Sequence, residues 1–380
     1  AESAAAVPPL ATSPDEAQDQ FLRSQAQRIR NKDPKIFLGY PANMNRAPEG
    51  LLKWRRELAK VEIGERPANN VGDPFEASGI ASSSMLERDL VARFGARYGF
   101  PADDTWGFVS HSGTDSNMHG AYIGRTLLQQ RTGVEPKIYY TAEAHYSIQI
   151  IRDLLGLEEV LVKTNEDASM NVEDLADKLA RDKNHPVLLI ATFGTTFKGG
   201  IDDVDKIQAT LKGRESFVHL DAALFGGYLQ ASPYASVLEQ VRDGRRRYDS
   251  IAVSWHKFFG HPGVAGLFIC RNKDFQQYRE YFSQVHDPAY ISHVPGTITC
   301  SRDSLSPAEV HYYSTLEAFS QQQGDAMLVL DNAIYLHEQM QRNFPQLQPR
   351  LANKLSNTVY FDKKFSDQVV DKWTLATVGG

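Results

Sequence analysis

The sequence predicts an α/β fold in which helices cover both faces of a mainly parallel sheet. Short apolar strands alternate with helical stretches from about residue 105 to residue 275. The strands are apolar at consecutive positions, as strands buried on both faces are. The segments between them are long enough for the helical crossovers that parallel strands require.

Composition excludes several classes of protein. The chain has 380 residues, is 42% hydrophobic and 23% charged, and carries a formal net charge of −6. This is ordinary globular composition, long enough for two domains or for one large domain with an appendage. No apolar run approaches the roughly 20 residues that span a bilayer, and no basic surface is indicated. We therefore expect no membrane and no nucleic-acid partner.

The two cysteines, Cys270 and Cys300, form no CxxC pair. A disulfide scaffold and a Cys-rich zinc site are excluded, and we expect no metal site. One bridge is conceivable, but its absence is expected, which fits a cytoplasmic protein.

The N-terminal residues 1–60 predict an arm followed by helices. Residues 1–14 are Ala- and Pro-rich without a basic start, so we expect a flexible arm, or one ordered by a partner subunit, and not a signal peptide. Helices are predicted from Pro14 to about Arg30, over 48–59 and over 83–98. Ser83 or Ser84 is the expected N-cap of the last helix.

The central region predicts alternating strands and helices. The expected strands are 107–109, 137–141, 159–162, 187–192, 217–220, 250–253 and 266–270. The expected helices are 116–130, 147–155, 172–182 and 204–211. The tail predicts one or two helices over 308–342 and short strands at 358–361 and 373–377, as in a small α+β domain. Ligands of parallel sheets bind at the carboxyl ends of the strands, so we expect the functional residues to lie there.

Two charged residues stand at such ends. Lys257 follows the strand 250–253 in SWHKFFG, where it is either a surface loop lysine or a Schiff-base lysine whose pKa is lowered by desolvation. Asp221 ends the strand in FVHLDAALFGG, where it is either the N-cap of a helix or the partner of a protonated pyridine nitrogen. Ala223 is small enough to let a flat ring lie over the backbone.

Three further motifs also follow strands. Ser112, Gly113 and Thr114 in SHSGTDSN place hydroxyls and backbone N–H groups at a helix start, which is typical of a phosphate site and also of ordinary capping. His145 in AEAHYS is a loop histidine or one that stacks on a flat ring. Thr195 and Thr196 in FGTTFKGG bond either a ring substituent or their own turn. Each motif is weak alone, but their order along the chain favours one pyridoxal phosphate site.

These motifs resemble the pyridoxal-phosphate-dependent group II amino-acid decarboxylases, in particular their shorter bacterial histidine decarboxylases. The matching segments span roughly residues 35–320 and include GYP, NNVGD, SGTDSNMHGAYIGR, AHYS, FGTTFKGGIDDVDKIQ, HLDAALFGG, SIAVSWHKFFG, YIS and TITCSR. The resemblance implies the fold-type I, aminotransferase-like architecture. It also implies a homodimer, with residues 1–60 forming the dimer, 61–300 a large pyridoxal-phosphate-binding domain and 301–380 a small C-terminal domain.

The resemblance also implies a role for each site residue. Lys257 would hold the cofactor by a Schiff base, Asp221 would pair with the ring nitrogen, His145 would stack on one ring face, and Ala223 would lie beneath the other. The phosphate would be held by Ser112, Gly113, Thr114, Ser254 and His256. Thr196, or instead Thr195, would approach the phenolic oxygen. Tyr290 is the candidate proton donor at Cα, and Arg302 would bind a neighbouring subunit or a carboxylate, or form an interface ion pair.

The implied activity is that of a carboxy-lyase that converts an L-amino acid, histidine or a related one, to its amine and CO2. Transamination, decarboxylation-dependent oxidation or carbon–carbon bond formation with the same cofactor are the alternatives. The sequence departs from the histidine enzymes at Trp255, Cys300, Asp303-Ser304 and His111-Ser112. We expect these positions to lie near the substrate.

Overall fold

The computed structural model describes residues 13–30, 33–76, 81–286, 289 and 294–378. The chain divides into two compact units, one made of residues 41–364 and the other of the residues up to Tyr40 together with those from Phe365 onward. The three-part domain division expected from the sequence stays a prediction.

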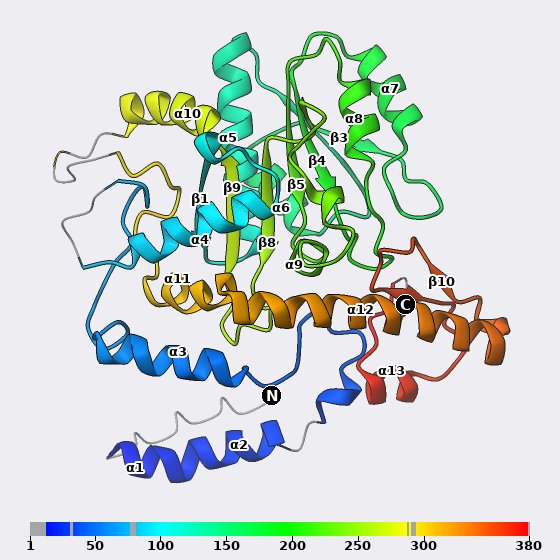
Figure 1. Ribbon diagram of the computed structural model, residues 1–380. Helices are drawn as coiled ribbons and strands as arrows, with labels where there is room; N and C mark the ends of the chain where they lie inside the picture. The colour runs from blue at the N-terminus through cyan, green and yellow to red at the C-terminus, as the bar shows by residue number, and fades with distance from the viewer. Residues whose placement is uncertain (1–12, 31–32, 77–80, 287–288, 290–293, 379–380) are drawn as a thin grey trace, which may run out of the picture. The chain divides into compact units, whose positions relative to one another are not determined.

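Within the described residues, the larger unit is built on a seven-stranded sheet (Figure 1). In spatial order its strands are β1 (Thr105–Ser110), β9 (Gly266–Arg271), β8 (Ser250–Ser254), β5 (Ser216–Asp221), β4 (Val187–Thr192), β2 (Lys137–Thr141) and β3 (Glu159–Val162). β9 is antiparallel to both of its neighbours, and the other strands share one direction. The predicted mainly parallel sheet is confirmed, and each strand predicted between residues 105 and 275 lies within two residues of an observed one.

Helices cover both faces of this sheet because its strands bury alternate residues on opposite sides. Phe108 and Leu188 belong to the cluster under α5 (Gly113–Thr132), α6 (Ser147–Leu154) and α10 (Asn272–Val285). Val109 and Leu189 belong to the cluster under α4 (Ser84–Arg97), α7 (Val172–Arg181), α8 (Val204–Thr210) and α9 (Gly226–Leu229). The predicted two-sided coverage is confirmed, and α10 is an element that the sequence analysis missed.

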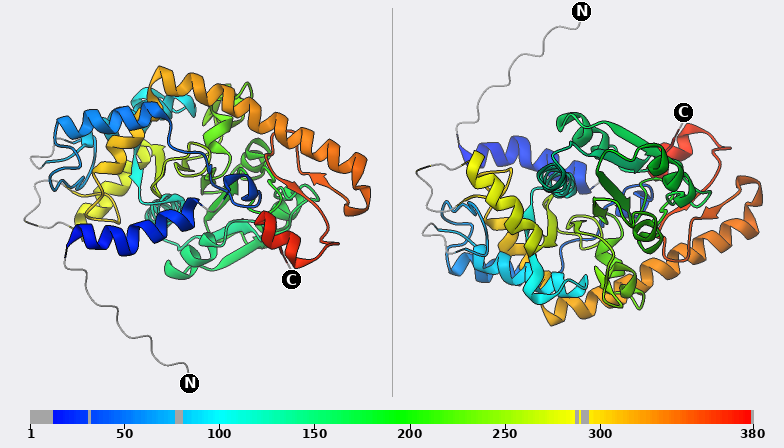
Figure 2. Two further views of the ribbon diagram at one scale, coloured as in Figure 1. Left: turned by 90° about the horizontal axis from the view of Figure 1, so that it is seen from below. Right: turned by 90° about the horizontal axis from the view of Figure 1, so that it is seen from above.

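Several elements flank the sheet. They are α3 (Glu49–Lys60), the hairpin β6–β7 (Val241–Arg242 and Arg245–Arg246), α11 (Leu305–Val310), α12 (Leu316–Asn343) and the pair β10–β11 (Arg350–Leu351 and Val359–Tyr360). The long helix α12 packs against α9 and the β10–β11 pair, and Figure 2 shows it in orange. The strand predicted at 358–361 is therefore the two-residue β11. None of the helices in the described part of the chain is long and apolar enough to cross a membrane.

The smaller unit contains α1 (Pro14–Ala17), a π-helical turn (Gln18–Leu22), α2 (Arg23–Arg30) and α13 (Asp367–Trp373). The predicted helix from Pro14 to Arg30 is confirmed, and the Ser13 hydroxyl accepts a hydrogen bond from the Glu16 N–H at 3.1 Å. The strand predicted at 373–377 is wrong. Trp373 ends α13, and Thr374 has a left-handed φ of 48°, which turns the chain where a strand would have to begin.

Two smaller predictions have mixed outcomes. Ser83 is the N-cap residue of α4, but it makes no side-chain capping bond; its hydroxyl donates instead to the Ser304 carbonyl at 2.6 Å. Both cysteines are free, so the expected absence of a disulfide is confirmed.

Candidate active site

The predicted site residues gather at one edge of the sheet. β1, β2, β4, β5 and β8 run in the same direction, so their carboxyl ends lie at the same edge. The residues that follow these strands are Ser112, Gly113 and Thr114 after β1, His145 after β2, Thr195 and Thr196 after β4, Asp221 and Ala223 at the end of β5, and Ser254, His256 and Lys257 at the end of β8. The edge thus brings together one amine, one carboxylate and several hydroxyl and imidazole groups.

Lys257 is not an exposed loop lysine. Its side chain is half-buried, and its carbonyl oxygen accepts a hydrogen bond from the Asn43 N–H at 2.9 Å. Burial lowers the pKa of the Lys257 amine, while the negative charge of Asp221 acts in the opposite direction. A lysine whose pKa is lowered in this way is suited to react as a neutral amine with a carbonyl group.

Asp221 is buried and held by two hydrogen bonds. Its Oδ1 accepts from the Ala223 N–H at 3.1 Å, and its Oδ2 accepts from the Asn117 side-chain amide at 2.9 Å. It does not cap α9, which begins at Gly226 with Phe225 as its N-cap. No Arg or Lys of the described residues forms a salt bridge with Asp221, so a cationic ligand group would complete its environment.

The start of α5 offers backbone N–H groups to which an anion could bind. The N–H groups of Gly113 and Thr114 lie in the first turn, where a helix offers them no internal partner. A Cβ on Gly113 would lie 2.6 Å from Ser254 Oγ and 3.3 Å from the Ala223 Cβ, so these three residues adjoin. The Ser112 hydroxyl serves as an ordinary cap by accepting from the Asp115 N–H at 3.1 Å.

His145 is half-buried, and its Nδ1 lies 2.8 Å from Ser147 Oγ. Burial lowers its pKa most strongly, the nearby Lys257 charge lowers it further, and Asp221 opposes both. The imidazole is therefore disposed to be neutral. That state suits stacking on a flat ring.

The two threonines have different surroundings. Thr195 is buried, and its hydroxyl accepts from the Gly200 N–H at 2.8 Å, so it stabilises its own turn. Thr196 is exposed, and its hydroxyl makes no hydrogen bond within the described ranges. Thr196 is thus the one that remains free for a ligand.

These residues fit pyridoxal phosphate. The site offers an amine of lowered pKa, a buried carboxylate without a cationic partner, and backbone N–H groups to which an anion could bind. His256 adds a buried Nδ1 that has no hydrogen-bond partner among the described residues, which a bound ligand could satisfy. Tyr290, the candidate proton donor, lies outside the described residues.

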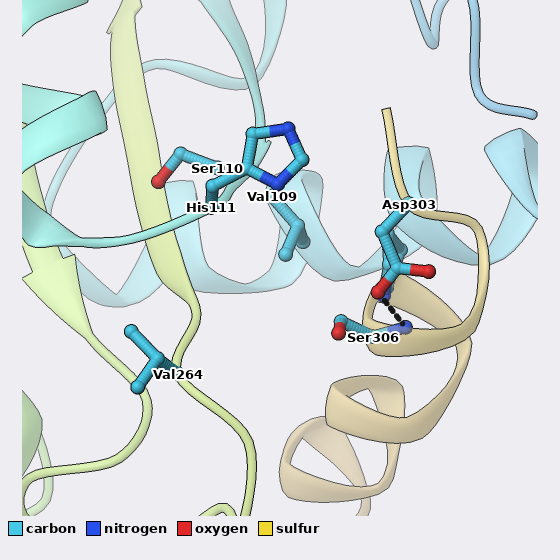
Figure 3. A pocket seen from close by; sticks show the side chains of 7 residues that line it. Val109, Ser110, His111, Val264, Asp303 and Ser306 are labelled. Carbon is cyan, nitrogen blue, oxygen red and sulfur yellow. Dashed lines mark hydrogen bonds between the residues drawn. The ribbon is translucent and has the colours of Figure 1, made fainter. Parts of the chain in front are cut away.

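Two of the positions at which the sequence departs from the histidine enzymes, Trp255 and His111, are adjacent in the chain to predicted site residues, whereas Asp303 lies just before α11. Trp255 is fully buried in the core, with its ring 5.0 Å from the Phe94 ring and 4.7 Å from the Phe259 ring. His111 and Asp303 line a small cavity together with Val109, Ser110, Val264, Ser306 and Pro307 (Figure 3). Asp303 accepts from the Leu305 and Ser306 N–H groups at the start of α11. Packing therefore accounts for Trp255 and capping accounts for Asp303, and the expectation that these positions lie near the substrate stays a prediction.

Arg302 is buried, and its partner lies in the same chain. It forms a salt bridge with the buried Glu87 of α4, and its Nη2 donates to the Gly72 carbonyl at 3.0 Å. Of the expected partners, which were a neighbouring subunit, a carboxylate or an interface ion pair, the structure shows a carboxylate, that of Glu87 in the same chain. The pair joins the segment after residue 296 to α4.

Sequence analysis missed two residues beside Asp221. Asn117 lies one turn after Gly113 on α5, and His219 precedes Asp221 by two residues on β5. Both spacings are readable signals, since residues i and i+4 share a helix face and residues i and i+2 share a strand face. Asn117 lies in the motif SGTDSNMHGAYIGR and His219 in HLDAALFGG, but no role is predicted for either from the sequence.

Comparisons with known proteins agree with this geometry. Residues 119–321 match the model of the pyridoxal-dependent decarboxylase conserved domain. The chain is 31% identical to a histidine decarboxylase of Mesorhizobium japonicum over 303 residues, which cover 78% of this chain and 75% of that enzyme. It is 29% identical to serine decarboxylase 2 of rice over 316 residues, which cover 82% of this chain and 64% of that enzyme.

The fold also matches solved structures. L-methionine decarboxylase from Streptomyces sp. 590 superposes with a TM-score of 0.79 at 21% identity, covering 98% of this chain and 89% of that one. This match confirms the fold-type I architecture. The chain therefore belongs to the pyridoxal-dependent decarboxylases, enzymes that use pyridoxal phosphate to remove the carboxyl group of an amino acid.

Proposed function

We propose that the substrate is L-histidine and that the products are histamine and CO2. The observation that carries this proposal is the similarity to the histidine decarboxylase of Mesorhizobium japonicum, which extends over three quarters of that enzyme. The positions of Trp255 in the core and of Asp303 at a helix start support this proposal. Both residues differ from those of the histidine decarboxylases, but packing and capping explain them, so they do not argue against histidine as the substrate.

Serine is the second candidate substrate. The rice serine decarboxylase is similar over most of this chain, although the match spans less than two thirds of that enzyme. Serine and histidine differ in size and in hydrogen-bonding groups, so one experiment separates them.

We assign the chemistry to the residues at the strand-end edge. Bound pyridoxal phosphate supplies a ring that takes up the electron pair left by the departing carboxylate. The Lys257 Nζ would hold the cofactor covalently, and the Asp221 carboxylate would accept a hydrogen bond from its protonated ring nitrogen. His145 and Ala223 would hold the ring from its two faces.

The remaining residues orient the cofactor. The N–H groups of Gly113 and Thr114 would hold the phosphate together with Ser112, Ser254 and His256. The Thr196 hydroxyl would approach the phenolic oxygen, since the Thr195 hydroxyl already accepts from the Gly200 N–H. Tyr290 would supply the proton at Cα of the product.

The test is incubation of the loaded protein with each common amino acid, with CO2 and amine followed by mass spectrometry. We expect histamine from histidine, and no amine from the Lys257→Ala variant. Formation of ethanolamine from serine, without histamine from histidine, would show that serine, the second candidate, is the substrate. A keto acid or an aldehyde without an amine would contradict decarboxylation as the outcome.

We further propose that the protein is a cytoplasmic homodimer, with residues 1–60 forming the dimer, 61–300 binding the cofactor and 301–380 forming a small domain. The two free thiols support a reducing compartment. Sedimentation of the loaded protein tests the dimer. A fully active monomer would contradict it.

A further inference from the structure

Asn117 connects the helix that begins at the proposed phosphate site to the buried carboxylate of Asp221. Its side chain is 2% exposed, and its Nδ2 donates to Asp221 Oδ2 at 2.9 Å. It lies one helical turn after Gly113, so the same first turns of α5 face both that site and the carboxylate.

His219 fixes the orientation of the Asn117 amide. Its Nε2 lies 2.9 Å from Asn117 Oδ1, and its Nδ1 lies 2.7 Å from Ser250 Oγ. The opposite amide orientation would place Asn117 Oδ1, which only accepts hydrogen bonds, against the carboxylate oxygen of Asp221. Nε2 of His219 must therefore carry the hydrogen, and Nδ1 accepts from the Ser250 hydroxyl.

Burial keeps this histidine neutral. His219 is fully buried, and desolvation lowers its pKa to about 4, although the nearby Asp221 charge acts in the opposite direction. At neutral pH the imidazole therefore has one hydrogen, on the nitrogen that faces Asn117.

The result is a chain of donors that all point the same way. Ser250 donates to His219, His219 donates to Asn117, and Asn117 donates to Asp221. Aligned hydrogen bonds strengthen one another, and donors to a carboxylate stabilise its charged form. With the Ala223 N–H on Oδ1, this chain also fixes the plane of the Asp221 carboxylate.

The fold leaves space for the imidazole at this place. A Cβ on Gly120 would lie 2.2 Å from His219 Nδ1, so α5 approaches the ring as closely as only glycine allows. On the sheet side, the His219 ring stacks on Phe268 with centroids 6.3 Å apart. Helix and sheet thus enclose the ring between them.

We propose that Asn117 and His219 are positioning residues that hold the Asp221 carboxylate directed at the ring nitrogen of pyridoxal phosphate. They do not contact the reacting atoms; they act through Asp221. This inference rests on the proposed role of Asp221, and its consequence is that the ring nitrogen stays protonated in the loaded enzyme.

The test is nitrogen NMR of the protein loaded with 15N-labelled pyridoxal phosphate, since the chemical shift reports whether the ring nitrogen carries a proton. The variants are Asn117→Leu, His219→Leu, His219→Gln and, as the reference for a lost partner, Asp221→Ala. Asn70→Leu is the matched control, because Asn70 is another buried amide that bonds Ser83 and Glu87 and not Asp221.

We expect Asn117→Leu and His219→Leu to shift the ring nitrogen toward the unprotonated value found with Asp221→Ala. Cofactor affinity should fall by roughly tenfold, as for the loss of a hydrogen bond to a charged group. His219→Gln should retain the wild-type nitrogen shift, because a glutamine amide also donates to Asn117. Asn70→Leu should retain the shift even if it lowers the melting temperature.

The outcomes separate this inference from the role of Asp221. A wild-type shift in Asn117→Leu and His219→Leu, with a changed shift in Asp221→Ala, would overturn the positioning role. An unchanged shift in Asp221→Ala would overturn the role of Asp221 itself. If circular dichroism shows that Asn117→Leu does not fold, Asn117→Ala, which adds no volume, decides by the same criterion.

Discussion

Burial sets the charge states at the strand-end edge. It lowers the pKa of Lys257, His145, His219 and His256, so each of these bases is disposed toward its neutral form. Asp221 is the buried acid among these residues, and it accepts hydrogen bonds from the Asn117 side-chain amide and the Ala223 N–H. The site therefore combines bases of lowered pKa with one carboxylate, which suits a cofactor with a cationic ring nitrogen and an anionic phosphate.

The neutral state of His219 has a consequence for stability. Its pKa of about 4 in the folded state lies below the ordinary value near 6.5 of the unfolded chain. Between these values the unfolded state binds more protons, so the free energy of unfolding falls as the pH falls from 6.5 to 4. The difference corresponds to about 3 kcal/mol.

Urea denaturation at pH 7, 5.5 and 4 measures this effect. We expect the loss of stability to be smaller by about that amount in His219→Gln, which cannot titrate. Parallel pH profiles of the variant and the wild type would show that His219 does not carry the effect.

At the scale of elements, the proposed binding of the cofactor phosphate at the start of α5 depends on Gly113 having no side chain. A methyl group on Gly113 would press on Ser254 and Ala223 and enter the proposed phosphate site. Gly113→Ala should therefore weaken cofactor binding by tenfold or more while α5 itself remains folded, which equilibrium dialysis measures.

Gly324 in α12 is the matched control for this substitution. A Cβ there meets nothing within 4 Å. Gly324→Ala should stabilise the protein by up to about 1 kcal/mol through helix propensity and leave cofactor affinity unchanged. Equal cofactor affinity in the two variants would contradict the proposed phosphate site.

The Arg302–Glu87 pair joins α4 to the segment that precedes α11. Both side chains are buried, and Glu87 also accepts from the Val109 N–H at 2.8 Å, next to the end of β1. Removing one partner leaves a buried charge, so Arg302→Met should cost about 3–5 kcal/mol in urea denaturation.

The double variant Arg302→Met, Glu87→Gln should recover part of this loss, because glutamine keeps an acceptor for Val109 without the buried charge. A cost below about 1 kcal/mol for Arg302→Met alone would show that the pair behaves as an exposed one.

At the scale of the whole molecule, the sequence predicts the sheet and the edge that carries the site. The apolar runs identify the strands, and the parallel direction places Ser112, His145, Thr196, Asp221 and Lys257 together. Sequence could not show that Trp255 turns into the core or that Arg302 finds Glu87, because both depend on contacts between residues far apart in the chain. The strand predicted at 373–377 failed for a local reason, the left-handed turn at Thr374.

Covalent trapping of the cofactor tests the central claim most directly. The loaded protein is reduced with borohydride, digested and examined by peptide mass spectrometry. The account predicts one modified residue, Lys257, in the peptide that contains SWHKFFG, and no trapped cofactor in Lys257→Ala. A pyridoxyl group on a different lysine, or trapping that persists in the variant, would contradict it.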